Sequence, residues 1–133
     1  MREIKFRGWY KKELMSSYMR VDFPCMIYDV QDAYDCELGQ SFSDILSDEN
    51  AIVMQFTGLQ DIKGKDIYEG DVIKSKVLKA DNGKYLTVEV KWNQDYCGFE
   101  PFFPDGHEEY WCFSNCEVIG NIHKNPELVK KNE

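Results

Sequence analysis

Cysteine and histidine are the residues of this sequence whose types and spacing first suggest metal or nucleophilic chemistry. The possible zinc ligands gather in the C-terminal third and are Cys97, His107, Cys112, Cys116 and His123. Structural zinc sites usually combine two closely spaced ligand pairs. Three residues separate Cys112 from Cys116, and the sequence offers no second pair of this kind. We therefore expect buried free thiols, with no metal and no cofactor.

Carboxylates are the second candidate for chemistry, because a pair of them can exchange protons with a substrate or bind a hard cation. A loop that contains proline and glycine is expected from Asn93 to Asn115, and it carries Asp95, Glu100, Asp105, Glu108 and Glu109. A solvated loop has the same composition, and the glycines are scattered singly rather than in a phosphate-binding motif. A Cys–His pair here would lack a third group to orient the histidine. We expect no catalytic residue, no small-molecule substrate and a protein that is not an enzyme.

Recognition of another macromolecule is the alternative to catalysis, and the N-terminal segment carries suitable side chains. Lys5, Arg7 and Trp9 alternate with apolar residues, so they share one face of an expected strand over residues 3–9. A tryptophan beside cations can stack on a nucleic-acid base or on a partner's side chain. An edge strand protected by charge has the same composition. Both interpretations stay open at this point.

A second possible contact region lies around Phe99, Phe102 and Phe103. These aromatic residues and two nearby prolines carry more apolar area than a loop in water usually exposes. The segment therefore either folds back to cover the core or forms a contact surface. The sequence favours self-association or contact with a partner.

The residues around Asn82-Gly83 predict a β-hairpin. Asn-Gly fills the two left-handed positions of a type I′ turn, which joins two strands tightly. The expected cross-strand pairs are Val77 with Val88, Ser75 with Val90 and Ile73 with Trp92 on one face, and Lys76 with Glu89 and Lys74 with Lys91 on the other. The other face is then basic, and its lysines are Lys74, Lys76, Lys79, Lys84 and Lys91. This face makes a nucleic-acid-binding regulator the second hypothesis.

The charge of the whole chain opposes nucleic-acid binding, because 16 basic and 24 acidic residues give a net charge of −8. Residues 21–61 contain nine acids and no lysine or arginine. This stretch suggests a third hypothesis, an acidic DNA mimic that inhibits a host enzyme. The five cysteines are an odd number, and no segment resembles a secretory signal or a membrane span. We expect free thiols in a reducing cytoplasm and no membrane association.

Short strand-like runs and turn signals predict a mainly β protein of the β-rich α+β class. Gly58, Gly64 and Gly70 separate such runs from residue 51 onward, and turns are expected at residues 61–65 and 69–71. A short helix is expected from Ser41 to about Asn50. Strands are also expected at residues 14–18, 110–113 and 116–122, and a helical turn after Asn125. We predict one compact unit with three parts. The first is an N-terminal β lobe with a short helix over residues 1–50, the second is an SH3-like small β-barrel over 51–124, and the third is a tail over 125–133.

Three segments together resemble the YopX family of phage and prophage proteins. They are IKFRGWYKKELM near the start, VMQFTGLQDIKGKDIYEGDVIK in the middle and CEVIGNIHKNPELV near the end. The sequence departs from the family pattern at three positions. Gly8 replaces a usual alanine, Tyr10 replaces a usual aspartate, and His123 takes a place often held by tyrosine.

The resemblance implies a largely β protein of phage or prophage origin in the cytoplasm of a bacterial host, and it implies no catalytic residues. With the residue-level observations, it favours a non-enzymatic protein-interaction module that forms a homo-oligomer. The expected interaction residues are Lys5, Arg7, Trp9, Lys74, Lys76, Lys91, Phe99, Phe102 and Phe103.

Overall fold

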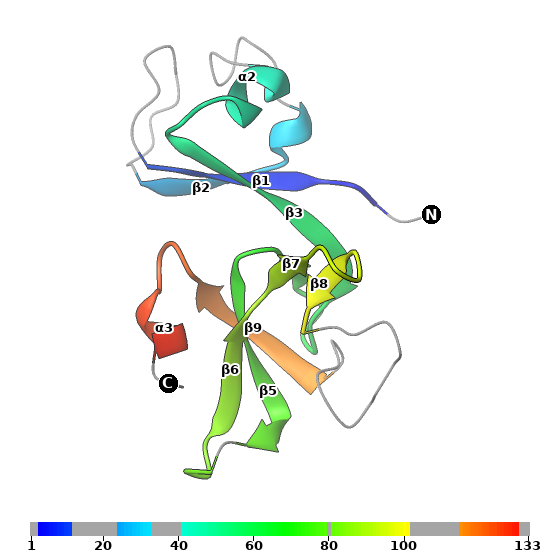
Figure 1. The fold of residues 1–133 in the computed structure, drawn as a ribbon, viewed down its shortest axis with the longest axis vertical. Helices are drawn as coiled ribbons and strands as arrows, with labels where there is room; N and C mark the ends of the chain where they lie inside the picture. The colour runs from blue at the N-terminus through cyan, green and yellow to red at the C-terminus, as the bar shows by residue number, and fades with distance from the viewer. Residues whose placement is uncertain (1–2, 12–23, 33–40, 80, 102–114, 131–133) are drawn as a thin grey trace. The chain divides into compact units, whose positions relative to one another are not determined.

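The computed structural model describes residues 3–11, 24–32, 41–79, 81–101 and 115–130, and this part is mainly β (Figure 1). The chain divides into two compact units, residues 1–56 and 57–133. The strands are β1 (Phe6–Tyr10), β2 (Cys25–Tyr28), β3 (Ala51–Gln60), β4 (Asp66–Tyr68), β5 (Asp71–Lys79), β6 (Tyr85–Glu89), β7 (Lys91–Asn93), β8 (Gly98–Glu100) and β9 (Cys116–Asn121). The helices are η1 (Val30–Asp32), α2 (Phe42–Leu46) and α3 (Glu127–Lys130). Within the described ranges, no helix has the length and apolar character needed to cross a membrane.

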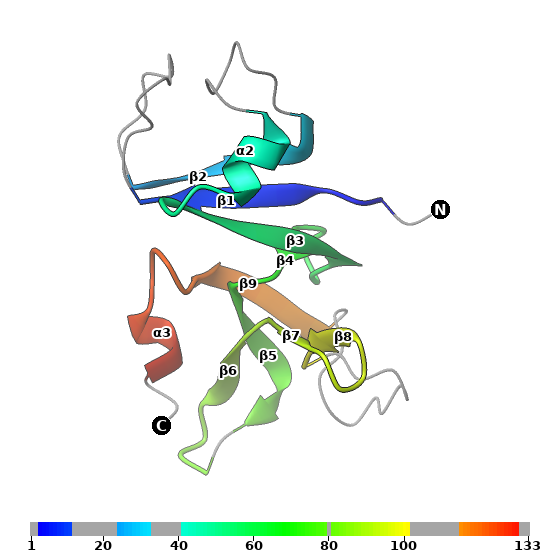
Figure 2. The same ribbon diagram turned by 45° about the horizontal axis from the view of Figure 1, so that its top comes forward.

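The first unit is an antiparallel ladder covered on one face by η1 and α2 (Figure 2). β1 lies between β2 and β3, so that Trp9 is opposite Met26 on one side and Ile52 on the other. Its core consists of Tyr10, Val30 and Ile45, all at most 1% exposed. The expected N-terminal strand is confirmed, whereas the expected strand at residues 14–18 lies outside the described residues.

The helix predicted from Ser41 is confirmed as α2, and its start has a physical cause. The Ser41 side chain accepts a hydrogen bond from the Asp44 backbone N–H, and the Asp44 carboxylate accepts one from the Ser41 N–H. This reciprocal capping box satisfies donors that the first turn would leave unpaired. The helix ends at Leu46 rather than near Asn50, because the Asp48 carboxylate accepts the Asn50 N–H and holds a turn there instead.

The second unit is built around β5, which pairs antiparallel with both β6 and β9. One face of this three-stranded sheet is buried in the core of the unit, which contains Ile67, Ile73, Val90, Phe99, Cys116 and Val118. The strand predicted at residues 116–122 is confirmed as β9, and the helical turn after Asn125 is confirmed as α3. The strand predicted at residues 110–113 lies outside the described residues.

The turns predicted at residues 61–65 and 69–71 are confirmed, with positive φ angles of 81° at Gly64 and 87° at Gly70. Each turn is closed by the aspartate beside it. The Asp61 carboxylate accepts backbone N–H bonds from Lys63, Lys65 and Val118, all at 2.9 Å. Asp71 accepts the Tyr68 N–H at 2.8 Å. The expected strand end at Gly58 is wrong, because Gly58 takes a φ of 89° inside β3 and the strand continues to Gln60.

The predicted hairpin exists, but its predicted register and turn type are wrong. Ile73 is opposite Val88 rather than Trp92, and Lys79 is opposite Tyr85. The register shifts between Lys74 and Lys79. Ser75 explains this bulge, because its buried Oγ accepts the backbone N–H groups of the two residues that follow Lys76.

The hairpin turn is wider than a two-residue loop. A type I′ turn needs a positive φ at both central residues, and Gly83 has one, at 79°, whereas Asn82 does not. The Asn82 side chain instead accepts the Lys84 N–H at 2.9 Å.

The hairpin strand also ends sooner than predicted. Val90 donates its N–H to the Asp71 carbonyl, and the Val90 carbonyl accepts the Gly70 N–H. With these two bonds the β5–β6 ladder ends. β7 then turns back as β8, and Trp92 is opposite Phe99. Part of the loop expected from residue 93 onward is therefore a second short hairpin.

Candidate functional site

A groove of about 540 Å³ lies on the face of the β6–β5–β9 sheet that points away from the core. Apolar atoms make up most of its lining. The lining residues are Lys74, Asn82, Gly83, Lys84, Tyr85, Thr87, Ile119 and Leu128. All of them belong to the second unit, and they come from β5, the hairpin turn, β6, β9 and α3.

Strand alternation places these side chains outside the core. On β5, Ile73 and Ser75 are fully buried on the core side, so Lys74 between them projects to the opposite face. Lys74 is opposite Thr87 on β6 and Glu117 on β9. The middle of the outer face therefore carries a row of polar side chains across the three strands.

Tyr85 forms the hairpin side of the groove and has two cations beside its ring. The Lys74 Nζ lies 5.9 Å from the ring centroid, and the Lys79 Nζ lies 5.1 Å from it. Ammonium groups at this distance are attracted by the negative face of an aromatic ring. Tyr85 is still 38% exposed, so part of the ring is available to a ligand.

The C-terminal segment forms the opposite, apolar wall. The Thr87 hydroxyl donates a hydrogen bond of 3.2 Å to the carbonyl of Leu128, which fastens α3 to β6. Gly120 provides the space for this packing. A Cβ at Gly120 would lie 2.6 Å from Asn125 Oδ1 and 2.9 Å from Leu128 Cδ1. Ile119, beside Gly120, remains 36% exposed.

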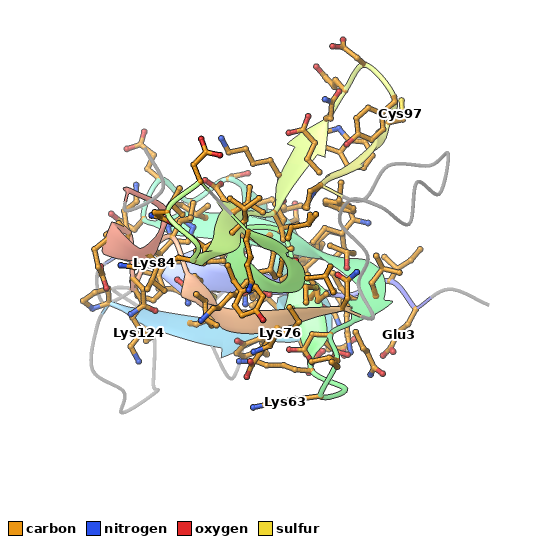
Figure 3. The ribbon with its side chains drawn as sticks, turned by 90° about the horizontal axis from the view of Figure 1, so that it is seen from below. Glu3, Lys63, Lys76, Lys84, Cys97 and Lys124 are labelled. Atoms are coloured by element: carbon orange, nitrogen blue, oxygen red, sulfur yellow. The ribbon has the colours of Figure 1, made fainter. Side chains whose placement is uncertain are left out.

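Two described lysines of this unit share one carboxylate, whereas the lysines at the groove have no such counterion. Lys63 and Lys76 both bind the Glu117 carboxylate at 2.7 Å, and Figure 3 labels the two side by side. These hydrogen bonds lower the pKa of Glu117 to about 2. Lys74, Lys79 and Lys84 have no carboxylate within 4.0 Å among the described residues. Lys84 lies on the α3 side of the unit, away from the Glu117 cluster (Figure 3).

The groove combines polar groups on the hairpin side with apolar groups on the α3 side. Its lining includes ammonium, phenol, hydroxyl and amide groups, all of which can donate hydrogen bonds, and the ammonium groups attract anions. Its apolar groups offer area for a planar or aliphatic part of the ligand. A ligand that satisfies both walls carries negative charge near the hairpin and an apolar group near α3.

The predicted N-terminal interaction face is used largely within the first unit. Arg7 is only 2% exposed, and its guanidinium donates to the Tyr28 hydroxyl at 3.4 Å and to Met54 Sδ at 3.9 Å. The Lys5 Nζ lies 4.6 Å from the centroid of the Phe56 ring. Trp9 is half-buried. The strand therefore turns much of its basic side toward its own unit.

The other predicted interaction residues are distributed over several places. Lys74 lies in the groove, whereas Lys76 is paired with Glu117 instead of the expected Glu89. Lys91 is exposed on β7 and does not face Lys74 as predicted. Phe99 is 8% exposed and packs in the core, with its ring centroid 5.0 Å from that of Trp92. Phe102 and Phe103 lie outside the described residues.

The possible zinc ligands are only partly within the described chain. Cys97 is exposed in the turn between β7 and β8, whereas Cys116 is fully buried on β9. His123 follows β9, and Cys112 and His107 lie outside the described residues. Over residues 3–11, 24–32, 41–79, 81–101 and 115–130, no three His, Cys, Asp or Glu side chains form a metal-binding group.

Sequence reasoning missed the residues that give the groove its apolar character: Tyr85, Ile119 and Leu128. Tyr85 carries a usable signal, because Lys84 alone separates it from Asn82-Gly83. Ile119 and Leu128 carry none, because their approach to the hairpin depends on the order of strands in the sheet.

Comparison with known proteins gives one family and a related fold. A family model described as "YopX protein" matches residues 5–130. Among solved structures, the crystal structure of protein EF1440 from Enterococcus faecalis is similar, with a TM-score of 0.62 and 22% sequence identity. The alignment covers 97% of this chain and 99% of that chain. At this identity the likeness concerns the fold alone. A search of curated proteins found no match.

Proposed function

The chain belongs to the YopX family, and we propose that it is a non-enzymatic protein-interaction module that binds its partner in the groove of the second unit. Following the family resemblance, we place it among accessory proteins encoded by a phage or prophage, acting in the bacterial cytoplasm. The observation that carries the proposal is the apolar groove bordered by lysines. A mostly apolar groove with a few polar groups on its border is the usual form of a binding site.

Two further properties belong to this proposal. We expect the protein to self-associate, because Val77, Tyr85 and Ile119 all expose apolar side chains in the second unit. We also assign the strands of residues 51–124 to an SH3-like barrel. The register shifts of β5 against both β6 and β9 support this assignment, because bulges bend strands as closure of a small barrel requires.

Nucleic-acid binding is the second candidate, and the ring of Tyr85 between two lysines favours it. An exposed aromatic ring can stack on a base while nearby ammonium groups hold phosphates. Among the described residues, Lys74 and Lys84 line the groove and Lys79 lies beside Tyr85, and the net charge of −8 repels a polyanion at longer range. We therefore rank a protein partner first.

Affinity capture from the bacterial host tests the proposed function. The wild type is compared with the groove variant Tyr85→Glu/Ile119→Glu and with the control Lys65→Glu/Lys91→Glu, whose residues lie outside the groove lining. We expect the wild type and the control to capture a host protein that the groove variant does not capture. Equal retention by all three would contradict the proposal. Light scattering at high concentration tests self-association, and a monomer throughout would contradict that part.

A further inference from the structure

We infer that the groove recognises a partner segment that carries both acidic and apolar side chains, with the acidic residues over the hairpin and an apolar residue over β9 and α3. This inference rests on the proposed function and names the chemistry of the partner. It commits to a protein segment whose carboxylates supply the counterions for the lysines of the hairpin.

Cations gather at the hairpin although the whole chain is acidic, with a net charge of −8. Lys63 and Lys76 share one carboxylate, Glu117. Lys74, Lys79 and Lys84 have none within 4.0 Å in the described part of the chain, and the same holds for Lys65, Lys91 and Lys124. What distinguishes the hairpin is that the ammonium groups of Lys74 and Lys79 both lie beside the ring of Tyr85 at the groove. Such a cluster of cations favours an anionic partner at that place.

Charged and apolar side chains lie in different parts of the groove. Lys84 lies in the hairpin turn, and the ammonium groups of Lys74 and Lys79 lie beside the ring of Tyr85. Ile119 and Leu128 line the groove from β9 and α3 and carry no charge. A partner must therefore present two kinds of side chain in a fixed order along its segment.

The apolar lining distinguishes between classes of macromolecule. A nucleic acid satisfies the lysines and can stack on Tyr85, but the methyl group of thymine is only a small apolar contact for Ile119 and Leu128. An acidic and apolar protein segment matches both walls at once. The mostly apolar lining therefore favours the protein segment.

Selection from a random peptide library tests the inference without assuming a sequence. The wild-type protein is used as bait beside Lys79→Glu/Lys84→Glu, whose two positions are exposed, and beside the control Lys65→Glu/Lys91→Glu. Circular dichroism confirms that each variant folds. We expect the wild type and the control to enrich peptides rich in Asp or Glu and in Leu, Ile or Phe. The hairpin variant should lose the acidic residues from its selected peptides.

Fluorescence polarisation with a selected peptide then measures the effect of each contact. We expect each charge reversal at Lys79 or Lys84 to weaken binding about fivefold or more, which is about 1 kcal/mol. Lys84→Arg should retain binding because the positive charge remains. Ile119→Ser should weaken it with no change in its salt dependence. Replacing Glu by Gln in the peptide should weaken it as much as the lysine reversals do.

Each alternative result has a distinct meaning. Enriched peptides without acidic bias that still depend on Tyr85 would overturn the inference and leave the proposed function intact. No enrichment above the Tyr85→Glu/Ile119→Glu variant would overturn both. Saturable binding of oligothymidine at about 50 mM salt, without peptide enrichment, would replace the inference with nucleic-acid binding.

Discussion

At the scale of single residues, Gly8 and Tyr10 act as a pair on β1. Both are buried, and they lie on the same face of the strand. A Cβ at Gly8 would lie 3.0 Å from Cε2 of the Tyr10 ring, which is tighter than ordinary packing. Burial, with the nearby Asp48 and Cys25 adding to it, raises the pKa of Tyr10 to about 12. The absence of a side chain at Gly8 therefore leaves room for the buried ring of Tyr10.

We predict that Gly8→Ala lowers the free energy of unfolding by about 1–3 kcal/mol, because the methyl group forces the buried ring to move. In a Tyr10→Leu background the same substitution should cost clearly less, since the ring is gone. Urea denaturation of the four proteins gives the coupling energy. An equal cost in both backgrounds would show that the ring contact is not the cause.

Glu117 gives the second prediction at this scale, which concerns pH. Hydrogen bonds from Lys63 and Lys76 lower the pKa of Glu117 from 4.5 to about 2. A lowered pKa favours the folded state above the unfolded pKa, and this stability is lost as the pH falls from about 4.5 toward 2. Glu117→Gln lacks this contribution. We expect its Tm to lie below that of the wild type at pH 7 and the difference to shrink steadily below pH 4.5.

Salt provides the control for this pH effect. The three side chains are partly exposed, so about 1 M salt should reduce the difference between wild type and Glu117→Gln at pH 7. A difference in Tm that changes with neither pH nor salt would mean that packing, and not charge, distinguishes the two proteins.

At the scale of elements, the turn at residues 61–65 depends on one buried carboxylate. Asp61 is 6% exposed and accepts three backbone N–H bonds, two within the turn and one from Val118 on β9. It joins a local turn to a strand that is distant in the sequence. The stretch between β3 and β5 is therefore a structural element, and its aspartates need no catalytic explanation.

We predict that Asp61→Ala lowers the free energy of unfolding by about 2–4 kcal/mol, because it leaves backbone donors without their acceptor. Asp61→Asn should cost less, since one acceptor oxygen remains. Urea denaturation measures both, with Asp81→Ala in the exposed hairpin turn as the control. Equal stability of Asp61→Ala and Asp81→Ala would contradict this role for Asp61.

The same elements show how far the sequence predicts the fold. Glycine and aspartate signals located the turns at 61–65 and 69–71 because these turns are made by neighbouring residues. The hairpin register could not be predicted in this way. The register depends on Ser75, whose Oγ accepts backbone N–H groups that would otherwise bond across the strands. It also depends on Val90, which follows β6 and bonds with the backbones of Asp71 and Gly70.

At the scale of the whole molecule, the described core residues form two separate clusters. Tyr10, Val30 and Ile45 belong to the first unit, and the cluster around Ile73 and Val118 belongs to the second. No residue belongs to both clusters. Loss of a core side chain should therefore act mainly on its own unit.

We predict that Ile45→Ala accelerates amide hydrogen exchange in β1 and β2 while β5 and β9 keep their protection. Removing the buried side chain should cost about 2–5 kcal/mol. Ile73→Ala should show the reverse distribution and serves as the matched comparison. Uniform acceleration along the chain in both variants would mean that the two units unfold as one.

The candidate site shows the same limit of sequence reasoning at the largest scale. The lysines of the hairpin could be named from the sequence, because charge and spacing are local properties. The different surroundings of Lys76 and Lys74 could not be predicted, because Lys76 meets Glu117 only where β5 pairs with β9. The apolar wall could not be predicted either, because it depends on β9 lying beside β5 and on α3 packing against β6.

Gly120 has a practical consequence for anyone who handles this protein. Its missing side chain lets α3 settle against β9, so Leu128 contributes to one wall of the groove. A recombinant version trimmed before Glu127 would lose the Leu128 side chain from that wall, and capture of the proposed partner should weaken for this reason alone.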